Sequence, residues 1–243
     1  VFIDGLKKLI HLDQKWVPSG EGTSLYIRPI YFATDEYVGM RPSETYTLVI
    51  FSSPASNYYT EPVRVMTTKK YVRSVRGGVG NVKMAGNYAA SLKAAQEAKE
   101  KGYHSVVWLD AIEQRYVEEC GTMNVFFVVD NASFPPPTTH APIREGVPRD
   151  GVIQTERDLG ISVEERAISM EEIRDKTASG SLQEAFGAGT AVSIAPIVLM
   201  NYEGSDIVLP GLDQRPVTNQ IYTKLNNIRT SAEADPYGWV VPV

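Results

Sequence analysis

A lysine and a tyrosine lie five residues apart in a glycine-rich run, and both side chains can take part in covalent or proton-transfer chemistry. Residues 77–88 read GGVGNVKMAGNY, so Lys83 has small or turn-forming neighbours and Tyr88 follows it. Glycines allow a backbone to come close to a flat ring and its phosphate. A lysine in a tight, partly dry pocket keeps a neutral, nucleophilic amine. The alternative is a solvated lysine in an ordinary glycine-rich loop ahead of a helix.

A second run adds a carboxylate and a hydroxyl to this inventory. Residues 118–124 read EECGTMN and contain Glu119 and Thr122. An amine, a phenol, a carboxylate and a hydroxyl in glycine-rich surroundings suit an aldehyde cofactor that is held as a Schiff base. Glu119 could instead be a solvated acid at the end of a strand, as we expect for its neighbour Glu118. The residues by themselves leave both interpretations open.

The composition is that of an ordinary globular protein without a strong charge bias. The 243 residues include 24 basic and 29 acidic side chains and are 43% hydrophobic, which suffices for one or two domains. The net charge of −5 provides no basic field for nucleic acid or anionic membranes. One cysteine fits a reducing compartment such as the cytoplasm. No apolar run approaches the ~20 residues of a membrane span, and the N-terminus does not resemble a signal peptide.

Hydrophobic patterning predicts alternating helices and strands that position these groups. The apolar segments 105–109 and 124–129 are predicted strands, and the alanine-rich segment 87–101 is a predicted helix that ends at Gly102. Residues 52–59 are typical of a linker. Further expected elements are helices at 6–12, 149–159 and 217–228, a helix that begins at the capping box 169–172, and strands at 24–32, 46–51 and 191–199. This alternation is typical of an α/β protein.

The two chemical runs and three further runs resemble the branched-chain aminotransferases, which are pyridoxal-phosphate enzymes of fold type IV. The further runs are residues 22–29 (GTSLYIRP), 146–150 (GVPRD) and 186–191 (FGAGTA), and the ending 235–239 (DPYGW) is also similar. The resemblance extends almost from end to end, in the expected order. It implies a mixed α/β (α+β) fold with a small α/β domain and a larger α/β pseudo-barrel domain.

The resemblance also implies a division of the chain. Residues 1–55 would be the C-terminal part of the small domain, residues 56–64 an interdomain loop that borders the active site, and residues 65–243 the large cofactor-binding domain. Members of this family carry a further stretch ahead of the point that corresponds to Val1. That stretch holds an arginine for the cofactor phosphate.

Individual residues receive roles from the same resemblance. Lys83 would hold pyridoxal 5′-phosphate and act as general acid and base, and Tyr88 would donate toward the phenolic oxygen of the ring. Glu119 would keep the pyridine nitrogen protonated, so that the ring becomes an electron sink. The other implied cofactor contacts are Thr122, Gly146, Val147 and Thr190. Pro148 departs from the family pattern, because it has no N–H to donate to the phosphate.

The implied substrates are L-leucine, L-isoleucine and L-valine, with 2-oxoglutarate as the amino acceptor and L-glutamate as its product. The amides of Thr190 and Ala191 would receive the α-carboxylate. Tyr26 and Arg28 would lie on the substrate side, where the arginine's fork of donors matches the second carboxylate of glutamate. A salt bridge at the edge of a sheet is the alternative role for Arg28. The implied assembly is a homodimer.

Two other functional interpretations stay open. A D-amino-acid transaminase or an aminodeoxychorismate lyase would share the lysine and the glutamate and would differ in the residues that bind the carboxylate. A catalytically inactive binding relative is the second alternative. We expect no nucleophilic role for Cys120, because the neighbouring carboxylate of Glu119 disfavours its thiolate. We expect no metal site, because metal-ligand spacing is absent around the three histidines, which are His11, His104 and His140.

Overall fold

The computed structural model describes residues 1–20, 22–56, 58–138 and 142–243. The chain divides into two compact units. The first contains Val1–Tyr58 together with Tyr237–Val243, and the second contains Tyr59–Pro236. The functional division into a small domain, an interdomain loop and a cofactor-binding domain stays a prediction.

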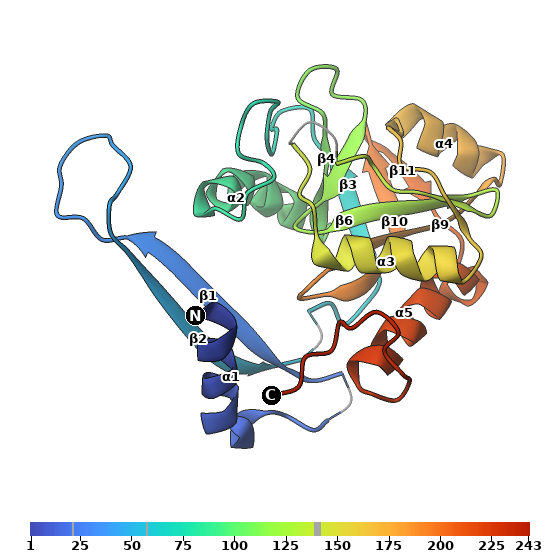
Figure 1. Ribbon diagram of the computed structural model, residues 1–243. Helices are drawn as coiled ribbons and strands as arrows, with labels where there is room; N and C mark the ends of the chain where they lie inside the picture. The colour runs from blue at the N-terminus through green and yellow to red at the C-terminus, as the bar shows by residue number, and fades with distance from the viewer. Residues whose placement is uncertain (21, 57, 139–141) are drawn as a thin grey trace. The chain divides into compact units, whose positions relative to one another are not determined.

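The first unit consists mainly of a helix and a long two-stranded antiparallel sheet (Figure 1). Helix α1 spans Phe2–Leu12 and is followed by the 3-10 helix η1, Gln14–Trp16. Strand β1, Ser24–Ala33, pairs with β2, Tyr46–Ala55, over its whole length. This register corrects the expected linker, since residues 52–55 complete β2. Their polar and proline side chains fit there because a two-stranded sheet has only edge strands, on which proline is tolerated.

The second unit is built on one mixed sheet, which has nine strands in the part of the chain that the structure describes. The order is β5-β4-β3-β10-β9-β6-β7-β8, with β11 paired to β10. Strand β3 runs parallel to both of its neighbours, whereas β9 is antiparallel to both β10 and β6. The bounds are β3 Val63–Thr67, β4 Ser105–Leu109, β5 Val117–Cys120, β6 Asn124–Val129, β7 Ala132–Phe134, β8 Ser162–Val163, β9 Leu182–Gly189, β10 Ser193–Tyr202 and β11 Ser205–Val208.

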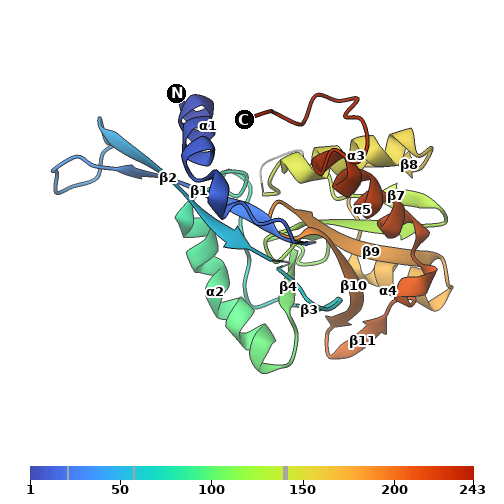
Figure 2. The same cartoon turned by 90° about the horizontal axis from the view of Figure 1, so that it is seen from below.

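Four α-helices of the described chain accompany this sheet. They are α2 Ala85–Glu100, α3 Val147–Asp158, α4 Met170–Ala178 and α5 Pro216–Arg229, and a 3-10 helix η2, Leu212–Gln214, precedes α5. Helix α2 places Ala94 and Ala98 one turn apart, and both pack in a cluster with Trp108 of β4. Helices α3 and α5 lie side by side (Figures 1 and 2). The predicted capping box is confirmed, because the Ser169 hydroxyl accepts the N–H of Glu172 at 3.0 Å.

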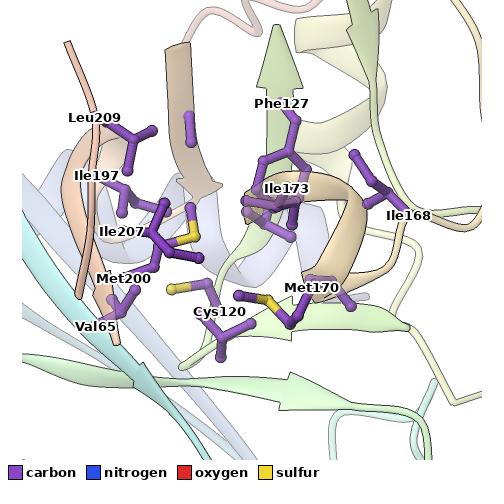
Figure 3. Close-up of a cluster of buried hydrophobic side chains, with 14 of the residues drawn as sticks. Val65, Cys120, Phe127, Ile168, Met170, Ile173, Ile197, Met200, Ile207 and Leu209 are labelled. Atoms are coloured by element: carbon purple, nitrogen blue, oxygen red, sulfur yellow. The ribbon is translucent and has the colours of Figure 1, made fainter. Parts of the chain in front are cut away.

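The largest core cluster gathers side chains from the sheet and from α4. Figure 3 shows Phe127 of β6, Ile197 of β10 and Ile173 of α4 converging within it. Strands β4 and β6 are buried along their whole length, which agrees with their continuous apolar runs. Strand β5 is also buried throughout, although two of its four residues are glutamates. A fully buried strand with two carboxyl groups is the first structural indication of a functional site.

Several elements differ from the sequence-based expectations. Strands β3, β5, β7, β8, β9 and β11 were not predicted, because they are short or mix glycine and charged residues with apolar ones. Strand β10 begins at Ser193 instead of Ala191, since Val192 donates its N–H to the Gly189 carbonyl in a tight turn. No helix among the described residues is long and apolar enough to cross a membrane.

Candidate active site

Lys83 lies in the loop that leads into α2, together with the tyrosine that follows it. The Lys83 ammonium donates to the Tyr88 hydroxyl, and Nζ lies 4.7 Å from the centre of the Tyr88 ring. The Asn87 side chain fixes the loop by donating to the carbonyls of Val79 at 2.7 Å and Val82 at 2.9 Å. The structure therefore brings the predicted amine and phenol into direct contact, on a loop that its own hydrogen bonds hold in place.

Glu119 is buried in β5, with only 4% of its surface exposed. Its Oε1 accepts from the guanidinium of Arg73 at 3.1 Å and from the backbone N–H of Arg144 at 2.7 Å. Its Oε2 makes no hydrogen bond to any residue that the structure describes. Burial raises the pKa of Glu119 to about 6, against the opposing effects of Arg73, Arg144 and Lys83. The carboxylate is thus ionised at neutral pH, and one of its oxygens is free to accept a donor from a ligand.

Arg73 and Arg144 are functional residues that the sequence analysis missed. The side chain of Arg73 is 8% exposed, and it also donates to the carbonyls of Gly80 and Pro142. These contacts tie the glycine-rich loop to the segment that precedes α3. Arg73 lies only ten residues ahead of Lys83. An arginine so close to the predicted catalytic lysine was the sequence signal that could have identified it. Arg144 contributes its backbone, which no side-chain pattern reveals.

The prediction for Glu118 was wrong. We expected a solvated acid, whereas only 7% of Glu118 is exposed. Glu118 would be solvated if β5 faced water. Instead, β5 pairs with β4 in an antiparallel arrangement and also contacts β6. Burial raises the pKa of Glu118 to about 7, although Arg73 acts in the opposite direction.

The segments that carry the remaining predicted cofactor residues meet near Asn124, at the start of β6. The Asn124 side chain donates to the Arg144 carbonyl at 2.9 Å, and its Oδ1 lies only 2.3 Å from where a Cβ on Gly146 would be. Asn124 also pairs with Ala188 of β9, two residues before Thr190. Thr122 precedes Asn124 by two residues, in the turn that closes β5 onto β6. The exposed turns that carry Thr122 and Thr190 therefore lie near the start of α3, where β6 begins and β9 ends.

The start of α3 is suited to bind an anion. Gly146 is the N-cap residue and Val147 begins the helix, so their backbone amides lie at the positive end of the helix dipole. Pro148 occupies the first turn, where the missing N–H is one that an α-helix leaves unpaired in any case. Val147 is exposed, which leaves this turn open to a ligand.

Two glycines of the site lie too close to neighbouring atoms to accept a side chain. A Cβ on Gly80 would lie 2.6 Å from the Pro142 carbonyl oxygen. A Cβ on Gly121 would lie 2.1 Å from the Ser105 hydroxyl, and the φ angle of Gly121 is +60°. This backbone conformation favours glycine. The glycines therefore permit the close approach of the Lys83 loop to the segment before α3, and of the β5–β6 turn to β4.

Gly121→Ala is expected to cost more stability than Gly102→Ala, which is its matched control. Both glycines have a left-handed φ, +60° and +84°, but a Cβ at Gly102 meets nothing within 4 Å. The control should lose about 1 kcal/mol from backbone strain alone, and Gly121→Ala should lose a further ~1–3 kcal/mol from overlap with Ser105. Urea unfolding of both variants measures the difference. Equal losses would show that Ser105 moves aside without cost.

Tyr26 and Arg28 belong to the first unit, and their role at the active site stays a prediction. Both lie on β1, two residues apart, and the Arg28 guanidinium carbon is 4.9 Å from the centre of the Tyr26 ring. This is a cation–π contact. Among the described residues Arg28 has no carboxylate within salt-bridge distance. The alternative of a sheet-edge salt bridge therefore finds no partner in the described chain.

The sequence analysis assigned no functional role to the three histidines or to Cys120. His104 lies 2.8 Å from a carboxylate oxygen of Glu61 and accepts the N–H of Arg64 at 3.0 Å. His11 lies in the last turn of α1, and His140 falls outside the described residues. No group of three or more potential metal ligands occurs in the part of the chain that was described. Burial raises the pKa of the Cys120 thiol to about 12, which makes it a poor nucleophile.

Comparison with known proteins adds independent evidence. The family model described as amino-transferase class IV matches residues 3–200. A curated relative, the probable branched-chain-amino-acid aminotransferase of Staphylococcus epidermidis, is 44% identical over 99% of this chain. The chain spans 68% of that relative's length.

Solved structures give the same result for the fold. The branched-chain aminotransferase of Thermoproteus uzoniensis, crystallised with norvaline, is 29% identical and has a TM-score of 0.78 over 90% of this chain and 69% of its own. The branched-chain amino acid aminotransferase from Escherichia coli is 26% identical and has a TM-score of 0.76 over 98% of this chain and 73% of its own. These matches confirm the predicted mixed α/β fold of the type IV aminotransferases.

Proposed function

The chain belongs to the amino-transferase class IV family, and from that premise we propose that it transfers the amino group of L-leucine, L-isoleucine or L-valine to 2-oxoglutarate. The products are the branched-chain 2-oxo acid and L-glutamate. The observation that carries this proposal is the joint arrangement of Lys83, Tyr88 and Glu119. An amine touches a phenol, and the same amine helps to lower the pKa of a buried carboxylate, one oxygen of which has no partner among the described residues.

The residues present fit pyridoxal 5′-phosphate. The Oε2 of Glu119, which has no partner among the described residues, can accept a hydrogen bond from a protonated pyridine nitrogen, and the Tyr88 hydroxyl can donate toward the phenolic oxygen. Gly146, Val147 and Thr190 offer amides and a hydroxyl at one edge of the sheet, as a phosphate requires. Glycines that admit no side chain let the Lys83 loop lie close to the segment before α3. When bound, this cofactor supplies an electron sink for the bond that is broken at the α-carbon of the amino acid.

The chain's own residues then have distinct tasks. Lys83 Nζ carries the proton that leaves and returns at the substrate, as general base and general acid. Tyr88 orients that amine through the hydrogen bond between them. Glu119 holds a proton on the nitrogen of the ring, and Arg73 keeps Glu119 ionised. Thr122 lies beside the phosphate-binding residues in this proposal.

Substrate recognition forms a separate part of the proposal. The amides of Thr190 and Ala191 lie in the turn between β9 and β10 and would receive the α-carboxylate. Arg28 would bind the second carboxylate of 2-oxoglutarate, with Tyr26 packed against its guanidinium. Discrimination among leucine, isoleucine and valine is worth only ~1–3 kcal/mol per methylene in an apolar pocket. We therefore expect all three amino acids to react.

The proposal includes a cytoplasmic homodimer. Its support is the single, buried cysteine, which fits a reducing compartment, and exposed apolar side chains on β1 and β2 that a second subunit could cover. These side chains are Ile30, Tyr31, Phe32, Leu48, Val49 and Phe51.

Absorption spectroscopy of the purified protein with pyridoxal 5′-phosphate tests the proposed function. We expect a visible band from the lysine-bound cofactor that bleaches when L-leucine is added and returns with 2-oxoglutarate. A band that ignores L-leucine but bleaches with D-alanine would identify a D-amino-acid transaminase instead. The lack of any band would favour the inactive relative.

A further inference from the structure

Three carboxyl groups interact at the β5 end of the sheet, and two of them accept hydrogen bonds from described residues. They are Asp110, which follows β4, and the adjacent Glu118 and Glu119 on β5. Strand β5 lies at one end of the strand order of the sheet. Glu118 lies at a register shift of the β4–β5 pairing, in which Trp108 pairs with Glu119 and Leu109 with Val117, and a β-bulge of this kind interrupts the regular alternation of side chains. Both glutamates have Arg73 as their principal opposite charge.

Asp110 is held as a carboxylate by the turn that it starts. Burial by itself would raise its pKa, but backbone N–H donors outweigh this effect and lower it. The donors are Ile112 at 3.2 Å, Glu113 at 2.7 Å, Arg115 at 2.9 Å and Tyr116 at 2.8 Å. A carboxylate that accepts several backbone N–H bonds is strongly stabilised in its charged form. Asp110 therefore contributes a fixed negative charge close to Glu118.

Glu118 has no comparable support. Its Oε2 is fully buried and has no hydrogen-bond partner among the described residues. The Nε–H of Arg73 is equally buried and equally without a partner in the described chain. The other end of the same guanidinium is committed to Glu119 and to two carbonyls. An orphan acceptor and an orphan donor thus belong to two side chains that interact electrostatically.

Burial, as the largest influence, raises the pKa of Glu118 to about 7. The positive charges of Arg73 and Arg76 oppose the rise, and the negative charges of Asp110 and Glu119 add to it. Two buried carboxylates that interact electrostatically with one guanidinium and with each other cannot both ionise easily, because like charges push their proton affinities apart. The member without donors is the one that keeps the proton.

We infer that Glu118 is a positioning residue that stays a neutral acid in the pH range where Glu119 is already ionised, so that Arg73 serves Glu119 alone. This inference rests on the proposed function, in which Glu119 must be the ionised partner of the cofactor ring. An ionised Glu118 would compete for Arg73 through the free Nε–H. The proton on Glu118 therefore keeps the guanidinium in place and preserves the charge of Glu119.

Two spectroscopic titrations of the cofactor-free protein test this inference. Infrared difference spectra between the wild type and Glu118→Gln should show a protonated carboxyl at pH 6 that disappears with a midpoint near pH 7. In ¹⁵N NMR, the Arg73 Nε–H signal, assigned by its loss in Arg73→Lys, should shift with the same midpoint in the wild type. In Glu118→Gln the transition near pH 7 should be absent, because glutamine copies the neutral acid, and only the titration of Glu119 near pH 6 should remain.

Glu113→Gln is the matched control, since Glu113 is an exposed glutamate in the neighbouring turn; the Arg73 signal should titrate in this variant as in the wild type. An ionised Glu118 at pH 6 would overturn the inference. So would an Arg73 signal that does not move while Glu118 titrates, because Glu118 would then be only structural. If Glu118→Gln does not fold, Glu119→Gln takes its place: the Arg73 signal should still shift with a midpoint near pH 7, because Glu118 is then the titrating partner. Neither readout depends on the reaction with L-leucine, so a failure of the proposed function is seen separately.

Discussion

Lys83→Ala should lose at least about 10⁴-fold in the rate of L-glutamate formation from L-leucine and 2-oxoglutarate, the upper range of what one general acid–base group contributes. Two tasks are lost at once, because the same Nζ would hold the cofactor and move the substrate proton. The side chain is exposed, and within the described chain it donates to Tyr88 alone. The variant should therefore fold with a stability within about 0.5 kcal/mol of the wild type.

Lys93→Ala on α2 is the matched control, since this exposed lysine lies outside the site. It should keep full activity and the visible absorption band, whereas Lys83→Ala should lose both. Activity and thermal unfolding are measured on the same samples, so that a folding defect is not mistaken for a catalytic one. Persistence of the visible band in Lys83→Ala would show that another amine holds the cofactor.

Glu119→Gln should lower the turnover rate by about 10²–10³-fold, as for the loss of one preorganised electrostatic group. Glutamine preserves the volume and can still accept from Arg73 and Arg144, but it has no negative charge to hold a proton on the ring nitrogen. The visible band should remain, because Lys83 is unchanged. Turnover measured with a fixed cofactor concentration, well above its dissociation constant, separates this effect from weaker binding. Unchanged turnover would remove Glu119 from the mechanism.

The pH dependence of the wild type gives a second check on Glu119. Because the raised pKa of this carboxyl is about 6, the ionised form predominates above that pH and is lost as the pH falls through it. Activity that depends on the carboxylate should therefore decrease on the acid side of about pH 6. The same acid limb should be absent in Glu119→Gln and present in Glu113→Gln, which changes an exposed glutamate of the neighbouring turn.

The fold was predictable where a segment's own residues dictate its environment. The continuous apolar runs of β4 and β6, the alanine-rich α2 and the capping box of α4 were all predicted close to their observed bounds. Strand β9 was not predicted, because its glycines and its glutamate give no regular alternation. Its buried environment comes from pairing with β6 and β10, which lie elsewhere in the sequence.

The candidate site divides in the same way. The sequence by itself determined the chemical groups, since amine, phenol, carboxylate and hydroxyl are properties of residue type, and the short spacing of Lys83 and Tyr88 made their contact a local matter. Only the tertiary structure decided which groups support them. Arg73 reaches Glu119 across 46 positions, and Arg144 does so across 25.

Burial is the other property of the site that only the tertiary structure determined. Glu118 and Glu119 are identical in type and adjacent in sequence, yet Glu119 has two donors and the buried Oε2 of Glu118 has none among the described residues. That difference follows from how β5 packs at the end of the sheet. The residue type by itself determines the chemical group of a side chain. The desolvation and the charges that set the proton affinity of that group are contributed by segments that are distant in the sequence.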